Sequence, residues 1–175
     1  MSQHSTPAPG WTCVLLRHAH AGNPAAWHRS DDLRPLSRLG WLQASDVVGA
    51  LSGLRLRSLL TSPASRCRQT LLPLSNTLSL EVEPRAELSL KGDREHLVAL
   101  LSSPESDGMV VCTHGEVIED VLDRWPGMNG HRREPTAKGG CWIISGSDGA
   151  PVDLTYVAPL RAEKAPQPDE VAASG

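Results

Sequence analysis

Residues 14–23 read VLLRHAHAGN, an apolar run that ends in an arginine–histidine pair and passes into a second histidine and a Gly-Asn loop. With the two residues before it, the segment TCVLLRH (12–18) has the continuous apolar character of a strand that is buried on both faces. Ligands of α/β proteins bind where such strands end. Arg17 and His18 are therefore candidates for a catalytic site, with a metal site and a merely polar strand end as the alternatives.

The rest of the chain alternates short apolar runs with segments of helical spacing. The predicted strands are 56–62, 80–84, 108–114, 139–146 and 152–158, and the predicted helices are 37–53, 63–78, 93–103 and 115–125. Ser37, Ser62 and Asp93 are predicted N-caps, and the last two strands are predicted to form a hairpin across 147–151. This alternation predicts an α/β fold, a three-layer αβα sandwich with a mainly parallel central sheet.

The composition indicates one globular domain. A chain of 175 residues with 39% hydrophobic residues fits one domain over 11–160, with flexible tails at 1–10 and 161–175. The net charge of -3, the absence of Phe and the single Tyr argue against a nucleic-acid partner. The N-terminus lacks the pattern of a signal peptide and no apolar run has transmembrane length, so we expect a cytoplasmic protein without a membrane partner. The four cysteines form no CxxC pair, which favours free thiols in a reducing compartment.

Three predicted strand ends carry residues of related chemistry. Arg17 and His18 follow the first strand, TSPASR (61–66) follows the second, and His114 follows the strand 108–114. If these strands are neighbours, two arginines and two histidines converge on one pocket. Two guanidiniums can fork onto the oxygens of a phosphoryl group, and a neutral imidazole between them can attack its phosphorus. The pattern therefore favours phosphoryl transfer.

The same segments resemble a known family. The order of LLRHAHAGN (15–23), LTSPASRCRQT (60–70) and VVCTHGEV (110–117) is similar to the histidine phosphatase superfamily, with its phosphoglycerate-mutase-like fold, over most of residues 12–158. RPLSRLGWLQA (34–44) resembles the SixA-type phosphohistidine phosphatases. A closer resemblance is to the phosphatase domain that follows a Nudix domain in some bacterial hydrolases, in which stretches like KGGCW (138–142) also occur. Ala19 stands where the family pattern has a glycine.

The resemblance implies a role for each catalytic residue. His18 matches the nucleophile that forms a covalent phosphohistidine, Arg17 and Arg66 match the phosphate-binding arginines, and His114 matches the second histidine. The implied activity is hydrolysis of a phosphomonoester or a phosphohistidine without a metal or cofactor. A nucleotide di- or polyphosphate phosphohydrolase of the same fold is the alternative.

The general acid and the substrate-binding residues are the next expectations. Glu87, after the third predicted strand, is preferred as the acid that protonates the leaving group, and Glu116 is its rival. Asn23, Ser62, Gly115 and Glu116 are expected to contact substrate.

Two other functions stay open at this point. His18 and His20 form an HxH pair which, with His114, could hold a metal in a metal-dependent hydrolase. The same pocket could also serve a non-catalytic phosphate-binding module. The substrate is open between a phosphohistidine protein, a nucleotide and a small phosphate ester. The basic run 131–138 and the stretch 27–29 are candidate pocket rims, and the sequence does not indicate an oligomeric state.

Overall fold

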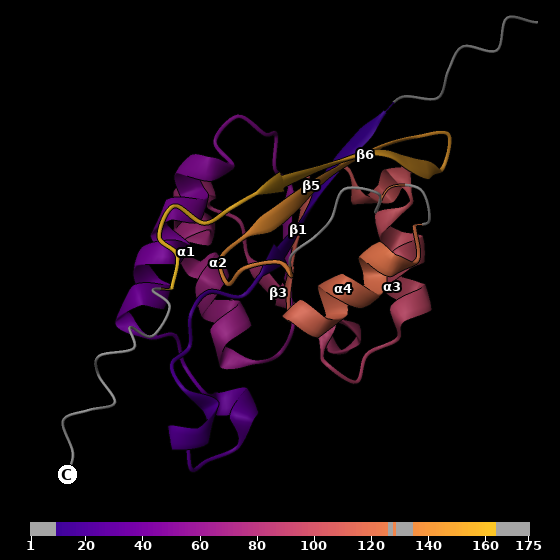
Figure 1. Ribbon diagram of the computed structural model, residues 1–175. Coiled ribbons are helices and arrows are strands. Elements are labelled where there is room, and N and C mark those ends of the chain that lie inside the picture. Colours follow the sequence, from indigo (N-terminus) through magenta and orange to yellow (C-terminus); the bar gives the residue numbers. More distant parts are fainter. Residues whose placement is uncertain (1–9, 126–127, 129–134, 164–175) are drawn as a thin grey trace, which may run out of the picture.

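In the computed structural model, which describes residues 10–125, 128 and 135–163, a six-stranded sheet lies between two layers of helices (Figure 1). The strands are β1 (Trp11–Arg17), β2 (Ser58–Thr61), β3 (Val82–Pro84), β4 (Met109–Thr113), β5 (Cys141–Ser147) and β6 (Ala150–Val157). They are arranged in the order β3-β2-β4-β1-β5-β6. The first four in this order are parallel to one another. At one edge, β5 pairs antiparallel with β1, and β6 pairs antiparallel with β5. The predicted α/β sandwich is confirmed.

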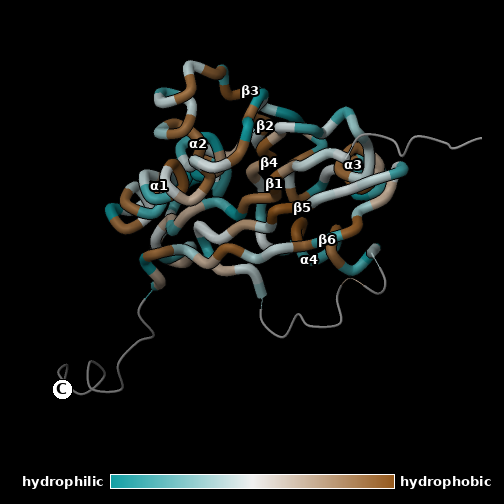
Figure 2. The backbone as a smooth tube through the Cα atoms, turned by 90° about the horizontal axis from the view of Figure 1, so that it is seen from above, coloured by the Kyte–Doolittle hydropathy of each residue, from teal (hydrophilic) through white to brown (hydrophobic). Residues whose placement is uncertain are grey.

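The helices cover the two faces of the sheet. Helices α1 (Arg38–Ala50) and α2 (Ser65–Leu78) pack on one face, and α3 (Arg94–Leu101) and α4 (Gly115–Asp123) on the other. Val14 and Leu16 belong to the core cluster under α1 and α2, whereas Cys13 and Leu15 belong to the cluster under α3 and α4. Figure 2 shows apolar segments gathered along β1 and β4, in the middle of the molecule. The predicted burial of β1 on both faces therefore holds, because alternate residues enter opposite cores.

Most of the predicted local signals are found. Ser37 caps α1 by accepting a hydrogen bond from Gly40 N, and Asp93 caps α3 by accepting from two backbone N–H groups. The predicted hairpin joins β5 and β6. The prediction that Ser62 caps α2 is wrong, because Ala64 is the N-cap and the helix begins at Ser65. The Ser62 hydroxyl instead contacts the buried imidazole of His114. Its hydrogen bond therefore satisfies a buried side chain and not a backbone N–H group of the helix.

The predicted tails lie largely outside the described residues. Within the described part of the second tail, Arg161 forms an ion pair with Asp46 of α1. The four cysteines are buried free thiols. Across the described ranges, no helix combines the length and the apolar character that a membrane span needs.

Candidate active site

The predicted convergence of the strand ends is confirmed by the sheet. Strands β2, β4 and β1 are neighbours, and the last residues of β1 and β4 pair with each other. His18, Ser62 and His114 each follow one of these strands, so all three lie at the same edge of the sheet. A pocket of about 330 Å³ opens there. Its lining includes Arg17, His18, Arg66, His114 and Glu116.

His18 is buried and held in one tautomer. Its Nδ1 lies 2.8 Å from the carbonyl oxygen of Ala19. Because a carbonyl only accepts, Nδ1 carries the hydrogen and Nε2 carries the lone pair. Nε2 in turn accepts a hydrogen bond from Nε of Arg66 at 3.4 Å. The neutral nitrogen that a nucleophile needs is therefore directed toward a guanidinium.

The protonation state of His18 follows from its surroundings. Burial is the main cause that lowers its pKa to about 3, and the charges of Arg66, His114 and Arg17 act in the same direction. The hydrogen bond to the Ala19 carbonyl opposes them. Burial has a larger effect than the neighbouring charges, since it disfavours the charged imidazolium.

Arg66 lies in the first turn of α2 and is 2% exposed. Its Nη1 donates to the backbone oxygen of Asp31 at 2.7 Å, and its Nη2 lies 2.9 Å from the Asp31 carboxylate. The same carboxylate accepts from Nε of Arg34 at 2.8 Å. Hydrogen bonding from Arg34, together with the charges of both guanidiniums, outweighs partial burial and lowers the pKa of Asp31. Asp31 is therefore an anion seated between two arginines that line the pocket.

His114 occupies the N-cap position of α4 and is 2% exposed. Its Nε2 lies 2.9 Å from the Ser62 hydroxyl, and its Nδ1 lies 3.3 Å from Nη2 of Arg66. Because a guanidinium only donates, Nδ1 accepts and Nε2–H donates to Ser62. The rings of His114 and His18 meet edge to face with centroids 5.5 Å apart. The predicted pair of histidines thus shares one small, buried space.

Arg17 approaches the start of α4 where only glycine leaves room. Its Nη1 donates to the backbone oxygen of Thr136 at 2.6 Å. A Cβ on Gly115 would lie 2.8 Å from Cζ of Arg17. Nε of Arg17 is buried and meets no hydrogen-bond partner within the described part of the chain. A buried guanidinium N–H that lacks a partner favours an anionic ligand at this position.

The two candidate acids lie in different places. Glu116 is the second residue of α4 and lines the pocket, whereas Glu87 is absent from the lining. Glu87 is half-buried in the short 3-10 helix η3 (Ala86–Leu88). That segment is tied to the end of β4, because the Thr113 hydroxyl donates to the backbone oxygen of Leu88 at 2.5 Å.

The side chains of Asn23 and His20 make contacts outside the predicted phosphate site. The Asn23 side chain is exposed and caps the 3-10 helix η1 (Pro24–Ala26) by accepting from Ala25 N at 3.0 Å. Nδ1 of His20 lies 2.6 Å from the Ser37 hydroxyl, and its Nε2 lies 3.0 Å from the Glu163 carboxylate. The structure therefore does not gather the three histidines of the metal hypothesis. Among the described residues, no three His, Cys, Asp or Glu side chains are grouped so that they could hold a metal ion.

Sequence reasoning missed Arg34 and Asp31. Arg34 is 8% exposed, lines the pocket and donates from Nη1 to the backbone oxygen of Ala21 at 2.8 Å. Arg34 is the first residue of the stretch RPLSRLGWLQA (34–44), which could have identified it. That stretch was used only to support the family resemblance. Lys138, from the basic run, also lines the pocket, while His131, Arg132 and Arg133 lie outside the described residues.

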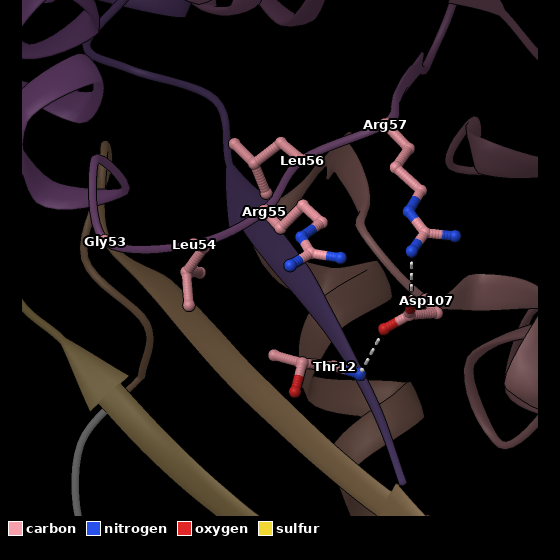
Figure 3. A pocket seen from close by; sticks show the side chains of 7 residues that line it. All are labelled: Thr12, Gly53, Leu54, Arg55, Leu56, Arg57 and Asp107. Carbon is pink, nitrogen blue, oxygen red and sulfur yellow. Dashed lines mark hydrogen bonds and ion pairs between the residues drawn. The ribbon is translucent and has the colours of Figure 1, made fainter. Parts of the chain in front are cut away.

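A second pocket lies at the opposite end of the sheet, where the parallel strands begin (Figure 3). Arg57 and Asp107 form an ion pair there, and the Asp107 carboxylate accepts from Thr12 N at 3.1 Å. The lining contains none of the predicted site residues. The chemistry-bearing residues are thus concentrated at the carboxyl ends of the strands.

Known proteins are similar to this chain in sequence and fold. The family model for the histidine phosphatase superfamily (branch 1) matches residues 13–89. An 8-oxo-(d)GTP phosphatase of Mycolicibacterium smegmatis is 30% identical over 162 residues, which are 87% of this chain. The alignment covers 50% of that protein, so the chain spans about half the length of this curated relative.

Solved structures show the same likeness. A protein of Nakamurella multipartitia assigned as the phosphohistidine phosphatase SixA is 27% identical, with a TM-score of 0.69 over 89% of this chain and 100% of that one. The protein histidine phosphatase SixA complexed with tungstate has a TM-score of 0.70 over 85% of this chain and 97% of that one. At 21% identity it shows the shared fold alone. Residues 13–89 belong to the histidine phosphatase superfamily, branch 1, and the chain as a whole has the fold of the solved SixA structures.

Proposed function

We propose that the chain hydrolyses a phosphomonoester or a phosphohistidine through a covalent phosphohistidine on Nε2 of His18. The observation that carries this proposal is the Nδ1–H bond to the Ala19 carbonyl, which leaves the Nε2 lone pair directed toward Arg66 in the pocket. A low pKa keeps this nitrogen unprotonated near neutral pH. Position, tautomer and charge therefore all suit a nucleophile.

In the first step Nε2 attacks phosphorus, the N–P bond forms, and the bond from phosphorus to the leaving group breaks. Arg17, Arg66 and His114 stabilise the charge that develops on the oxygens of the transferred group. The leaving atom keeps the bonding electrons and takes a proton from an acid. In the second step water attacks phosphorus, the N–P bond breaks, and inorganic phosphate is released. No step draws on a metal ion.

For the proton donor we favour Glu116, which lines the pocket one residue after Gly115 at the start of α4. Glu87, the acid that the family resemblance implies, is the second candidate, because η3 contacts the end of β4. A phosphohistidine leaving group needs less assistance than an alkoxide. The acid therefore matters most for phosphomonoesters.

The test is hydrolysis of p-nitrophenyl phosphate in EDTA by the wild type and by His18→Ala. We expect turnover by the wild type that EDTA does not affect, and its loss in a folded His18→Ala variant. Activity retained by that variant would reject His18 as the nucleophile. Loss of the wild-type activity in EDTA and its return with zinc would favour the metal-dependent hydrolase. A vanadate or phosphate complex without turnover of any phosphorylated substrate would favour the binding module.

A nucleotide di- or polyphosphate is the second candidate substrate. The M. smegmatis relative is an 8-oxo-(d)GTP phosphatase. Besides the two arginines that match the phosphate-binding pair, the pocket lining includes the cations of Arg34 and Lys138. Additional cations suit a substrate that carries more than one phosphate. A comparison of kcat/KM for nucleoside diphosphates, nucleoside monophosphates and phosphohistidine peptides will decide between these substrate classes.

A further inference from the structure

Lys138 is fixed beside the proposed nucleophile by a tight turn. The carbonyl of Ala137 accepts from Gly140 N at 2.9 Å, and Gly139 between them has φ +79. This is the conformation in which a turn requires glycine at its third position. Gly139 N also contacts the carbonyl oxygens of Arg17 and His18, at 3.3 and 3.2 Å. The backbone of Lys138 is therefore attached directly to the segment that bears the nucleophile.

The ammonium group of Lys138 forms an ion pair with the carboxylate of Glu163, which lies in the segment that follows β6. Nζ of Lys138 lies 3.0 Å from Oε2 of Glu163, and Oε1 of Glu163 lies 3.0 Å from Nε2 of His20. The segment that carries Glu163 is itself anchored to α1, because Gln43 donates to the carbonyl oxygen of Arg161 at 2.6 Å. Glu163 is thus a built-in counter-charge to a lysine that lines the active-site pocket.

The ion pair between Glu163 and Lys138 is weak. The side chain of Lys138 is 28% exposed and that of Glu163 is 52% exposed. Solvent screens an ion pair of this kind, so its contribution to stability is small. A phosphate group carries more charge than a carboxylate and offers three oxygens. It can therefore replace Glu163 as the partner of Lys138.

From this arrangement we propose that Lys138 is a specificity-determining residue, which binds a second phosphoryl group next to the one that His18 takes. Glu163 holds the lysine in place until such a substrate displaces it. The inference rests on the proposed function, since it assumes that the transferred group binds at His18. Among the candidate substrates of the proposed function it favours the second class, diphosphates and longer polyphosphates, over simple monoesters.

The experiment compares two stable probes by calorimetry, methylenebisphosphonate with two phosphonate groups and methylphosphonate with one. Neither is hydrolysed at its P–C bonds, so binding is measured without turnover. The quantity of interest is the dissociation constant of methylphosphonate divided by that of methylenebisphosphonate. A larger ratio means a stronger preference for the bisphosphonate. The variants are Lys138→Met, Lys138→Arg and Glu163→Gln. Glu105→Gln, an exposed carboxylate in the 3-10 helix η4 (Pro104–Ser106), is the matched control.

We expect Lys138→Met to lower the preference for the bisphosphonate about tenfold, the size of one charge-assisted hydrogen bond. Lys138→Arg should restore most of the preference, because it restores the charge. Glu163→Gln should raise the preference about threefold by removing the competing carboxylate. An unchanged ratio in Lys138→Met, or a lower ratio in Glu163→Gln, would overturn the inference.

Failure of the proposed catalytic function has a different signature. If His18 is not a nucleophile, turnover persists in His18→Ala, while the calorimetric ratio in the Lys138 variants still reports on the second phosphoryl group.

Discussion

Substitution of Gly115 by alanine is a direct test of how Arg17 is positioned. Gly115 is the first residue of α4, and a Cβ there would lie 2.8 Å from Cζ and 2.9 Å from Nε of Arg17. Ordinary van der Waals contact begins at 3.4 Å, so the guanidinium must retreat by about 0.6 Å. The bond from Nη1 to the Thr136 carbonyl, at 2.6 Å, limits where it can go.

The expected result is a loss of activity with little change in stability. A misplacement approaching 1 Å in a positioning group can cost about 10²-fold in rate, so we expect kcat/KM for p-nitrophenyl phosphate to fall about 10- to 100-fold. Alanine is the better helix former and this gain offsets the cost of displacing the guanidinium, so the free energy of unfolding should change by less than about 1 kcal/mol. Steady-state kinetics and urea unfolding measure the two quantities.

Gly49→Ala is the matched control. Gly49 lies inside α1, and a Cβ there would meet no atom within 4 Å. This variant gains the same helix propensity but should keep wild-type kcat/KM. A folded Gly115→Ala variant with wild-type kcat/KM would refute the reasoning, because the guanidinium of Arg17 would then not need its present position.

The remaining predictions concern the charges of the pocket. The pKa of His18, near 3 in the folded chain against an ordinary 6.5, means that only the unfolded chain takes up this proton between these values. The wild type should therefore lose stability relative to His18→Gln by up to about 1.4 kcal/mol per pH unit as pH falls from 6.5 to 3; parallel stability profiles in urea melts would contradict this. Glu116→Gln should lower kcat for phosphomonoesters by about 10²-fold and Glu87→Gln much less, and the reverse order would make Glu87 the acid. Asp31→Asn should tighten the binding of inorganic phosphate by up to about fivefold, because it removes a carboxylate that competes for Arg66; weaker binding in calorimetry would show that Asp31 serves mainly to position the guanidinium.

The sequence was sufficient to predict the central sheet because the apolar runs of β1 and β4 are continuous. A strand buried on both faces, with cores on either side, needs such a run. The caps at Ser37 and Asp93 were predictable because their partners lie within three residues in the chain. Ser62 failed as a cap for the opposite reason. Its partner, His114, lies 52 residues away and becomes a neighbour only when β2 and β4 pair.

The polar lining of the pocket was harder to predict. The contacts of Arg34 and Asp31 depend on how the loop after β1 folds back over α2, and no periodicity in the sequence describes that loop. The same limit applies to Asn23, whose side chain serves its own turn. Glu163 reaches His20 and Lys138 from a segment that was expected to be a flexible tail.

The most direct test of the account is to trap the phosphoryl group during turnover. The wild type is mixed rapidly with a ³²P-labelled substrate, quenched in alkali and mapped by mass spectrometry. We expect a transient phosphoryl adduct on His18 that is stable in alkali, labile in acid and absent from His18→Ala. Turnover without any adduct, or an adduct on another residue such as Cys67 or His114, would contradict it.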